Sequence, residues 1–338
     1  MKEKHRKFWG LAFAFALFAL AFAPFGAKKA ARAVKNEAAK ARYTFLICGA
    51  DKSASNTDVM MLASVDTEKR TLSVLQIPRD TFINPKSSGL GVTRVNAIYA
   101  AFLKKSAISG KEAKKEAMAS LCQTLGDALC IEIDRYLLID TAAFARIIDA
   151  VGGIECNVPF DMHYDDPAQN LHIHLEKGRQ TLDGEGAEQF IRYRSGYATG
   201  DIGRVEARES FLREALAQVK AKLTAASAAR IACEVAGDVV TNADAGEIAY
   251  FAAMLYGIGD ESTAIKTISG SAVQNPKTLA WVYYALNKRA ALGDINEYIA
   301  GGTEISYECF DKKAIFTDDR YGENPYISEY YYSQIKTE

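Results

Sequence analysis

The chain has 338 residues, a formal net charge of −1 and 49 % hydrophobic residues. This length and this hydrophobic share are enough for one large globular domain or two small ones. The near-neutral charge argues against general nucleic-acid binding, which normally requires a strongly basic domain, so no nucleic acid is expected as a partner.

The N-terminus contains an uncharged run at residues 8–27. A helix of this length spans about 30 Å, the hydrocarbon thickness of a bilayer. Basic residues flank the run on both sides, so the charge pattern alone does not fix its orientation. A cleavable signal peptide is the competing interpretation, although Pro24 makes a poor cleavage site after Ala23. We expect residues 1–27 to form a cytoplasmic tip and a membrane-spanning signal anchor, followed by a juxtamembrane spacer at residues 28–42.

Strands and helices alternate along the remainder of the chain. Short apolar and β-branched runs predict strands at residues 44–48, 59–65, 71–77, 133–139, 171–175 and 264–268. Helical spacing predicts helices at residues 95–105, 111–125, 141–150, 183–191, 203–225 and 245–256. Pro78 is expected to end the strand at residues 71–77. Residues 158–170 are interpreted as a polar loop. The alternation predicts a three-layer α/β/α sandwich with a central mixed sheet.

Three histidines lie close together in the sequence. The run at 171–175 alternates like a strand, which places His172 and His174 on one face. With His163 in the preceding loop, the group suggests zinc. The spacing matches no zinc signature, so exposed strand positions are the favoured interpretation.

The six cysteines show no paired metal-ligand spacing. Cys48 lies inside an apolar strand and is interpreted as a small core residue. Cys122 and Cys130 are a candidate disulfide pair if the domain is extracellular.

An arginine-rich segment at residues 192–208 carries the strongest chemical signal. Its sequence is RYRSGYATGDIGRVEAR. Arg204 and Arg208 are four residues apart and share a helix face, and Arg192 and Arg194 share a side if the chain is extended there. Asp201 stands at the N-cap of the predicted helix. Guanidinium groups and helix N-termini both favour phosphate oxygens, so the segment predicts a phosphate or diphosphate site. The alternative is that these arginines pair with surface acids.

Several segments in a fixed order resemble the LytR-CpsA-Psr family. They are ICGAD, NTDVMMLASVDTEKRTLSVLQIPRDT, TRVNAIYA, AVGGIECNVPFDMHYDDPAQNLHIHLEKGRQTLDGEGAEQFIRYR and GDIGRVEARESFL. The resemblance implies a catalytic domain at residues 43–296 and leaves residues 297–338 as a tail of unknown role.

The resemblance also implies an activity. Family members are membrane-anchored phosphotransferases that move a glycopolymer, such as teichoic acid or capsule, from a polyprenyl-diphosphate carrier to a peptidoglycan acceptor. The protein is thus expected to cross the cell membrane once, with its catalytic domain outside the cell. Two alternatives stay open, namely a polyprenyl-diphosphate pyrophosphatase and a non-catalytic protein that binds envelope glycans or modulates transcription.

Site residues are carried over by position. The resemblance assigns catalytic roles to Arg79, Asp80 and Asp201, and places Mg²⁺ or Mn²⁺ at Asp51 and Asp58. The predicted diphosphate site consists of Arg79, Arg94, Arg192, Arg194, Arg204 and Arg208. Asp80 and Asp51 are both candidates for the general base, with loss of the acceptor hydroxyl proton to water as the alternative. For Asp51 and Asp58 the alternative to metal binding is that they cap turns.

The chain departs from the family pattern at several positions. Ser53 stands where the family usually has an arginine, and Arg94 where it usually has a lysine. Ala207 and Arg208 occupy the places of an Arg-Gln pair. These changes put substrate preference and rate in question more than the fold.

Overall fold

The computed structural model describes residues 40–50, 56–83, 90–167, 171–193, 239–256, 258–274, 281–301 and 303–307, together with positions 196, 207, 211, 214, 215 and 218. The chain divides into two compact units. The sheet unit comprises residues 41–138, 240–242 and 261–338, and the hairpin unit comprises residues 1–40, 139–239 and 243–260.

The sheet unit is built on a six-stranded mixed sheet of order β10-β3-β2-β1-β4-β9. Its strands are β1 (Arg42–Ala50), β2 (Thr57–Asp66), β3 (Thr71–Ile77), β4 (Arg135–Asp140), β9 (Val240–Thr241) and β10 (Thr263–Thr267). The first three strands are antiparallel neighbours, and β10 runs parallel to β3. The mixed α/β prediction is therefore confirmed at this level.

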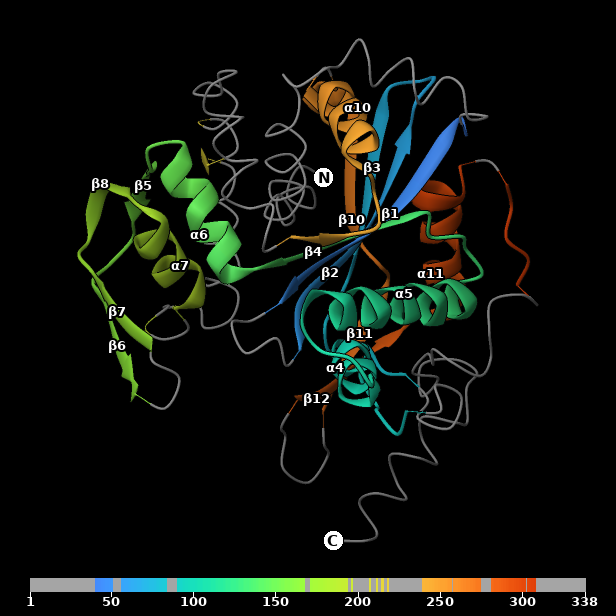
Figure 1. The fold of residues 1–338 in the computed structure, drawn as a ribbon, viewed down its shortest axis with the longest axis horizontal. Coiled ribbons are helices and arrows are strands. Elements are labelled where there is room, and N and C mark those ends of the chain that lie inside the picture. The colour runs from blue at the N-terminus through green and yellow to red at the C-terminus, as the bar shows by residue number, and fades with distance from the viewer. Residues whose placement is uncertain are drawn as a thin grey trace, which may run out of the picture. The chain divides into compact units, whose positions relative to one another are not determined.

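Helices cover one face of this sheet. They are α4 (Asn96–Lys105), α5 (Gly110–Leu129), α11 (Lys288–Ile295) and the π-helix η4 (Asn296–Ala300). Figure 1 shows α4, α5 and α11 gathered near one another. Leu46, Leu62 and Leu75 lie opposite one another on neighbouring strands and pack in one buried cluster with Leu121 and Leu125 of α5. Burying each such side chain stabilises the fold by about 1.5–3 kcal/mol.

The chain beyond residue 296, for which the sequence suggested no role, begins inside this core. Ile299 is buried, and its carbonyl oxygen accepts a hydrogen bond from Ser64 Oγ at 3.4 Å. Asn296 Oδ1 accepts from the Ile305 N–H at 2.8 Å. Residues 297–301 and 303–305 of the predicted tail therefore contribute to the sheet unit.

A two-stranded sheet that the sequence did not predict also belongs to the sheet unit. It consists of β11 (Gly270–Gln274) and β12 (Trp281–Leu286), which pair antiparallel. Gly270 packs so closely against β12 that an added Cβ would collide with the Ala285 carbonyl oxygen. The predicted last strand at 264–268 is therefore followed by two more.

The hairpin unit contains two further two-stranded sheets and, among its described residues, the helices named below and part of one more. The strands are β5 (Ile154–Val158) paired with β8 (Gly178–Leu182), and β6 (Met162–Asp166) paired with β7 (Leu171–Leu175). The helices are α6 (Thr141–Ala150), α7 (Gly184–Arg192) and α10 (Ala245–Tyr256). Figure 1 shows the four strands with α6 and α7 as one group. A short 3₁₀ helix, η3 (Asp260–Ser262), precedes β10.

The predicted loop at 158–170 is wrong in its middle, because β6 occupies residues 162–166. Only Met162 of this strand is fully buried, so its sequence lacks the apolar alternation that normally marks a strand. Pairing with the more apolar β7 forms the strand instead.

Helices α6 and α7 are held against each other by local backbone features. Gly152 and Gly153 have φ of +78° and +80° and end α6, as predicted from the glycine pair. The Gly184 N–H, at the start of α7, donates to Asp149 Oδ1 at 2.7 Å. An added Cβ at Gly184 would collide with the Ala145 carbonyl oxygen of α6, so this close contact requires glycine.

The predicted long helix at 203–225 is described at only five positions. Residues 207, 211, 214, 215 and 218 are all helical. Phe211 stacks on Phe190 of α7 with ring centroids 5.0 Å apart. Gln218 Nε2 donates to the Glu155 carbonyl at 2.6 Å, and Gln218 Oε1 accepts from the Glu155 N–H at 2.9 Å, which ties this helix to β5.

The suggested Cys122–Cys130 disulfide is wrong, since both cysteines are free. Cys122 lies on the buried face of α5 and Cys130 caps the helix C-terminus. Eight residues along a helix correspond to about 12 Å, beyond the Cα separation that a disulfide permits. Cys48 is fully buried, as predicted for a core residue.

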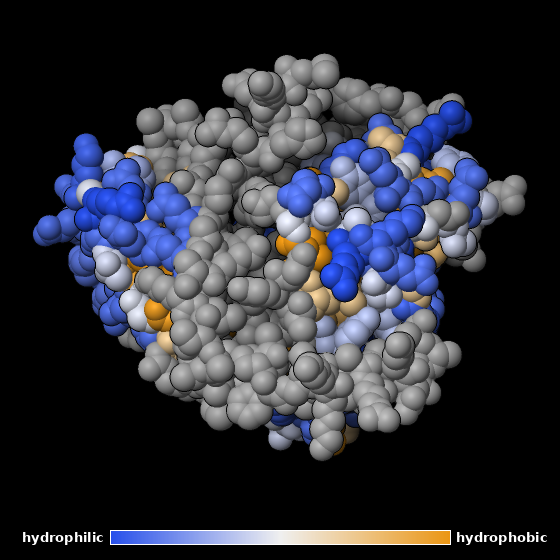
Figure 2. All heavy atoms as spheres, turned by 90° about the horizontal axis from the view of Figure 1, so that it is seen from above, coloured by the Kyte–Doolittle hydropathy of each residue, from blue (hydrophilic) through white to orange (hydrophobic). Residues whose placement is uncertain are grey.

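The proposed membrane-spanning run at residues 8–27 lies outside the described residues. Within the part of the chain that the structure describes, no helix is long and apolar enough to cross a membrane. The viewed face in Figure 2 is mostly hydrophilic over the described residues.

Candidate functional site

The candidate site in the sheet unit begins where β3 ends. Pro78 directly follows Ile77 and has no N–H to continue the strand pairing. Its carbonyl oxygen accepts hydrogen bonds from Thr81 N at 2.9 Å and from Thr81 Oγ1 at 2.6 Å. This turn places Arg79 and Asp80 at the end of the sheet.

A second segment runs beside this turn and brings in another arginine. Phe82 and Arg94 form an antiparallel bridge. The Asn96 N–H, at the start of α4, donates to the Arg79 carbonyl at 3.2 Å. The two motifs that carry Arg79 and Arg94 are thus adjacent in space.

Both arginines converge on a single carboxylate. Arg79 Nε lies 3.5 Å from Asp80 Oδ2, and Arg94 Nη1 lies 3.3 Å from Asp80 Oδ1. The three side chains are 38–42 % exposed, so the guanidinium groups reach solvent. Two adjacent guanidinium groups with one compensating carboxylate form a cluster suited to phosphate oxygens.

Strand β12 holds this cluster from the other side, a contribution that sequence reasoning missed. The Tyr284 N–H donates to the Asp80 carbonyl, and the Phe82 N–H donates to the Tyr284 carbonyl, both at 2.9 Å. Burial raises the pKa of the Tyr284 hydroxyl to about 12, and this hydroxyl donates to the Ile268 carbonyl at 2.7 Å. The strand therefore fixes the backbone on both sides of Thr81.

The neighbouring residue Tyr283 contacts the arginine itself. The Arg94 guanidinium carbon lies 5.7 Å from the centroid of the Tyr283 ring, within range of a cation–π contact. Phe82 meets the same ring edge-on, with centroids 5.0 Å apart. The sequence WVYYAL could have predicted a strand here, because it is rich in β-branched and aromatic residues. Its spacing does not reveal which ring lies against Arg94.

The two aspartates predicted to bind metal directly follow two paired strand residues in the sequence. Strand β1 ends at Ala50, which pairs with Thr57 of β2. Thr57 Oγ1 donates to the Asn96 carbonyl at 3.4 Å, so the start of β2 adjoins the Arg94 segment. Asp58 follows Thr57 and is described for its backbone only, whereas Asp51 lies outside the described residues.

In the hairpin unit, Arg192 ends α7 rather than lying in an extended segment. Asp183 caps this helix by accepting from the Gly186 N–H at 2.8 Å, and Tyr193 turns to extended geometry after it. The expected extended start of the arginine segment is therefore wrong at Arg192. Its Nη1 lies 3.0 Å from Oε1 of the buried Glu188, one helical turn earlier. For this arginine, pairing with an acid is observed.

The other predicted members of the arginine segment cannot be placed. Arg194, Asp201, Arg204 and Arg208 lie outside the described residues, and their roles stay predictions.

The three histidines are exposed, as the favoured interpretation predicted. His172 and His174 share a face of β7, while His163 lies on β6 and not in a loop. Among the residues that the structure describes, no group of three or more histidine, cysteine or carboxylate side chains is arranged to hold a metal ion.

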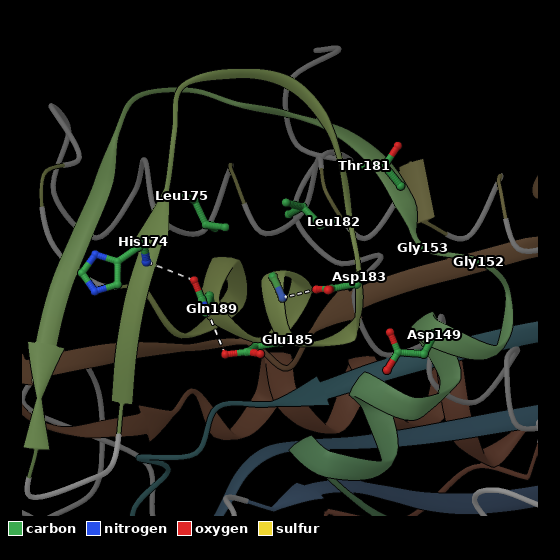
Figure 3. Close-up of a pocket in the computed structure, with 11 residues that line it drawn as sticks. Asp149, Gly152, Gly153, His174, Leu175, Thr181, Leu182, Asp183, Glu185 and Gln189 are labelled. Atoms are coloured by element: carbon green, nitrogen blue, oxygen red, sulfur yellow. Dashed lines mark hydrogen bonds between the residues drawn. The ribbon is translucent and has the colours of Figure 1, made fainter.

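A pocket of about 570 Å³ lies within the hairpin unit, between the end of α6 and the start of α7. Figure 3 shows Leu175 and Leu182 facing this space, whereas the His174 ring points away from it. Two of its three acidic residues, Asp149 and Asp183, accept backbone hydrogen bonds at the start of α7, and Glu185 Oε1 accepts a hydrogen bond from Gln189 Nε2 at 3.4 Å. None of the predicted site residues lines it.

Comparison with known proteins identifies the family. The model of the LytR_cpsA_psr family matches residues 23–297, so the chain belongs to this family.

Three curated relatives have names that refer to cell-wall synthesis. The polyisoprenyl-teichoic acid–peptidoglycan teichoic acid transferase TagV of Bacillus subtilis is 28 % identical over 210 residues, which cover 60 % of this chain and 50 % of TagV. The cell wall biosynthesis protein LcpA of Corynebacterium glutamicum is 27 % identical over 235 residues, 64 % of this chain and 44 % of the relative. The transferase TagU of Oceanobacillus iheyensis is 24 % identical over 268 residues, 78 % of this chain and 76 % of the relative. The chain thus spans about half the length of TagV and somewhat less of LcpA.

Solved structures share the fold. A crystal structure of a Streptococcus agalactiae protein superposes with a TM-score of 0.62 at 22 % identity, covering 84 % of this chain and 95 % of that one. The structure of TagT bound to LIIa-WTA gives a TM-score of 0.53 at 17 % identity, covering 77 % and 91 %.

Proposed function

We propose that this protein is a membrane-anchored phosphotransferase that moves a glycopolymer from a polyprenyl-diphosphate carrier to peptidoglycan during cell-wall assembly. The observation that carries the proposal is the cluster of Arg79, Arg94 and Asp80 at the end of the sheet, in a chain of this family. The names of TagV and TagU support the choice of substrate and acceptor.

The reaction requires stabilisation of charge more than covalent chemistry by the protein. An acceptor hydroxyl oxygen attacks the phosphorus attached to the glycopolymer, and the bond from this phosphorus to the bridging oxygen breaks. The electron pair of the broken bond stays on the bridging oxygen, so polyprenyl phosphate leaves as an anion. Fixed guanidinium groups directed at the diphosphate stabilise this developing charge without having to reorganise during the reaction.

Within this proposal Arg79 and Arg94 contact the diphosphate, and Asp80 positions them. Each Asp80 oxygen already faces one guanidinium group, so accepting the hydroxyl proton would weaken the attraction that holds both arginines. This leaves Asp51 as the remaining sequence candidate for the general base, with water as the other proton acceptor.

A direct assay tests the function. The full chain is incubated with a lipid-diphosphate-linked glycan and an oligomeric peptidoglycan acceptor, and the products are separated by mass. Transfer gives ligated glycan and polyprenyl phosphate, hydrolysis gives free glycan phosphate, and a binding protein gives neither. Either of the last two outcomes contradicts the proposal.

The proposal includes Mg²⁺ or Mn²⁺ held by Asp51 and Asp58. Ala50 and Thr57, which directly precede Asp51 and Asp58 in the sequence, pair with each other at the sheet end that carries Arg79. Carboxylate oxygens are the ligands that Mg²⁺ prefers, and a bound ion would lower the repulsion between these acids and a diphosphate.

The metal requirement can be measured directly. Asp58→Asn is expected to raise the Mg²⁺ concentration for half-maximal transfer, while Asp66→Asn, which changes an acid at the other end of β2, leaves it unchanged. Full activity in excess EDTA, or an unchanged requirement in Asp58→Asn, rules out this assignment.

The proposal further places residues 8–27 in the cell membrane, with the catalytic domain outside as a three-layer α/β/α sandwich. The length and apolar character of the run support this placement. Protease added to intact protoplasts is expected to digest the domain, and full protection would contradict an outside location.

A further inference from the structure

The hairpin formed by β6 and β7 has two chemically different faces. His163 lies opposite His174, and Asp165 lies opposite His172, so these four side chains share one face. The opposite face buries Met162, Ile173 and Leu175. The outward face thus presents three of the four histidines of the chain, next to one carboxylate.

Two of the histidines direct the same ring atom at each other. His163 Nδ1 lies 3.5 Å from His174 Nδ1, with ring centroids 5.7 Å apart. A hydrogen bond at that separation is at the long limit of the usual range. Two imidazole nitrogens that bind one tetrahedral Zn²⁺ at about 2.0–2.1 Å are about 3.3–3.4 Å apart. The observed separation therefore needs only a small adjustment to bind a metal ion.

The remaining contacts orient the rings. The other ring nitrogen of His174, Nε2, lies 3.2 Å from Asp165 Oδ1, and His172 Nδ1 lies 2.7 Å from the same oxygen. Metal-binding histidines commonly donate their second N–H to a carboxylate, which fixes the tautomer and leaves the first nitrogen as ligand.

The fold keeps this arrangement accessible. About half of the His174 and Asp165 side-chain surface is exposed. Figure 3 shows the His174 ring pointing away from the neighbouring pocket, while the His174 backbone N–H donates to Gln189 Oε1 of α7 at 3.0 Å. The backbone of β7 is therefore anchored while the ring stays open to solvent.

We propose that His163 and His174 bind one divalent transition-metal ion, with Zn²⁺ as the test ion, through their Nδ1 atoms, and that Asp165 positions His174. In this proposal the protein supplies two ligands and water completes the coordination. Imidazole favours Zn²⁺, Cu²⁺ and Ni²⁺ over Mg²⁺, so this site is chemically distinct from the aspartate site proposed for transfer.

Zinc titration of the full chain by calorimetry tests the site. His163→Asn and His174→Asn are each expected to weaken Zn²⁺ binding at least about tenfold, and Asp165→Asn to weaken it less. His172→Asn is the matched control, because it removes an imidazole from the same face and leaves the proposed ligands in place. Comparing the variants separates this site from any other zinc ligands in the chain.

A second measurement reports the ring atoms and does not depend on affinity. Ring ¹⁵N spectra are expected to show Zn²⁺ shifting Nδ1 of His163 and His174, with the affinity falling as the pH is lowered from 7.5 to 5.5, since protons compete for the ligands. Lack of zinc binding by the wild-type chain overturns the proposal. Undiminished binding by His163→Asn, or an equal loss in His172→Asn, also overturns it.

Discussion

The two described arginine regions hold their guanidinium groups in different ways. In the sheet unit, Arg79 and Arg94 share the half-exposed carboxylate of Asp80. In the hairpin unit, Arg192 pairs with Glu188, whose side chain is 8 % exposed. The first arrangement keeps two cations near solvent for a ligand, while the second also neutralises a buried charge. Arginines that were assigned to one predicted diphosphate site therefore have different structural roles.

The largest expected effect is on transfer by Arg79→Ala. Removing one fixed donor from a site that stabilises transition-state charge typically costs about 3 kcal/mol, roughly a hundredfold or more in rate. Because the side chain is partly exposed, the melting temperature is expected to stay close to that of the wild type. Near-normal turnover in this variant would remove Arg79 from the site.

Arg192→Ala is expected to reduce both transfer and stability. Glu188 would lose its ion-pair partner inside the protein, at a cost of about 1–3 kcal/mol in the free energy of unfolding. Chemical denaturation of Arg192→Ala and Arg79→Ala measured together tests the contrast, with Arg192→Lys as the control that keeps the charge. Equal stability of the two alanine variants would show that the two regions do not differ in this way.

A smaller effect is expected for Tyr283→Leu. An exposed cation–π contact contributes about 0.5–1 kcal/mol, so transfer should fall about two- to fivefold. Tyr283→Phe keeps the ring and serves as the control, with near-wild-type transfer. If both variants behave alike, the ring does not act through Arg94.

The smallest effect on transfer is expected for a pair in the sheet unit with no proposed role in that reaction. Arg42 Nη2 lies 2.9 Å from Asp66 Oδ2, and Asp66 Oδ1 also accepts from the Lys69 N–H at 2.8 Å. Asp66→Asn is expected to lower the free energy of unfolding by about 1 kcal/mol at pH 7 and to leave transfer unchanged.

The pH dependence of this stability loss has a defined sign. Burial alone would raise the pKa of Asp66, but the hydrogen bond from Lys69 N–H and the charge of Arg42 together lower it. A lowered carboxyl pKa stabilises the fold at neutral pH, and this contribution is lost as the pH falls below about 4. Denaturation curves of wild type and Asp66→Asn should therefore converge in acid, and a constant difference down to pH 2 would contradict the assignment.

The sequence predicted those elements whose own residues are sufficient to determine their structure. The apolar runs of β1 to β3 and the stop at Pro78 were predicted correctly, as was the end of α6 at Gly152 and Gly153. Strand β6 was missed because its pairing partner, and not its own pattern, makes it a strand.

The sequence could name residues of the candidate site, but not the contacts that bring some of them together. Family resemblance selected Arg79, Asp80 and Arg94, but no periodicity relates these residues to Tyr283 and Tyr284 far along the chain. Arg192 was placed in an extended segment because the capped helix before it was expected to end one residue earlier.

The backbone hydrogen bond between Tyr284 and Asp80 affects the order in which the chain can fold during synthesis. A chain synthesised from its N-terminus exposes the Arg79 turn early, yet the strand that fixes this turn emerges only about two hundred residues later. Contacts between such distant residues form slowly, because a long loop must close before they stabilise anything. The arginine cluster is therefore completed late in biogenesis, and an unfinished chain that ends before β12 would carry Arg79 and Asp80 without the strand that holds them in place.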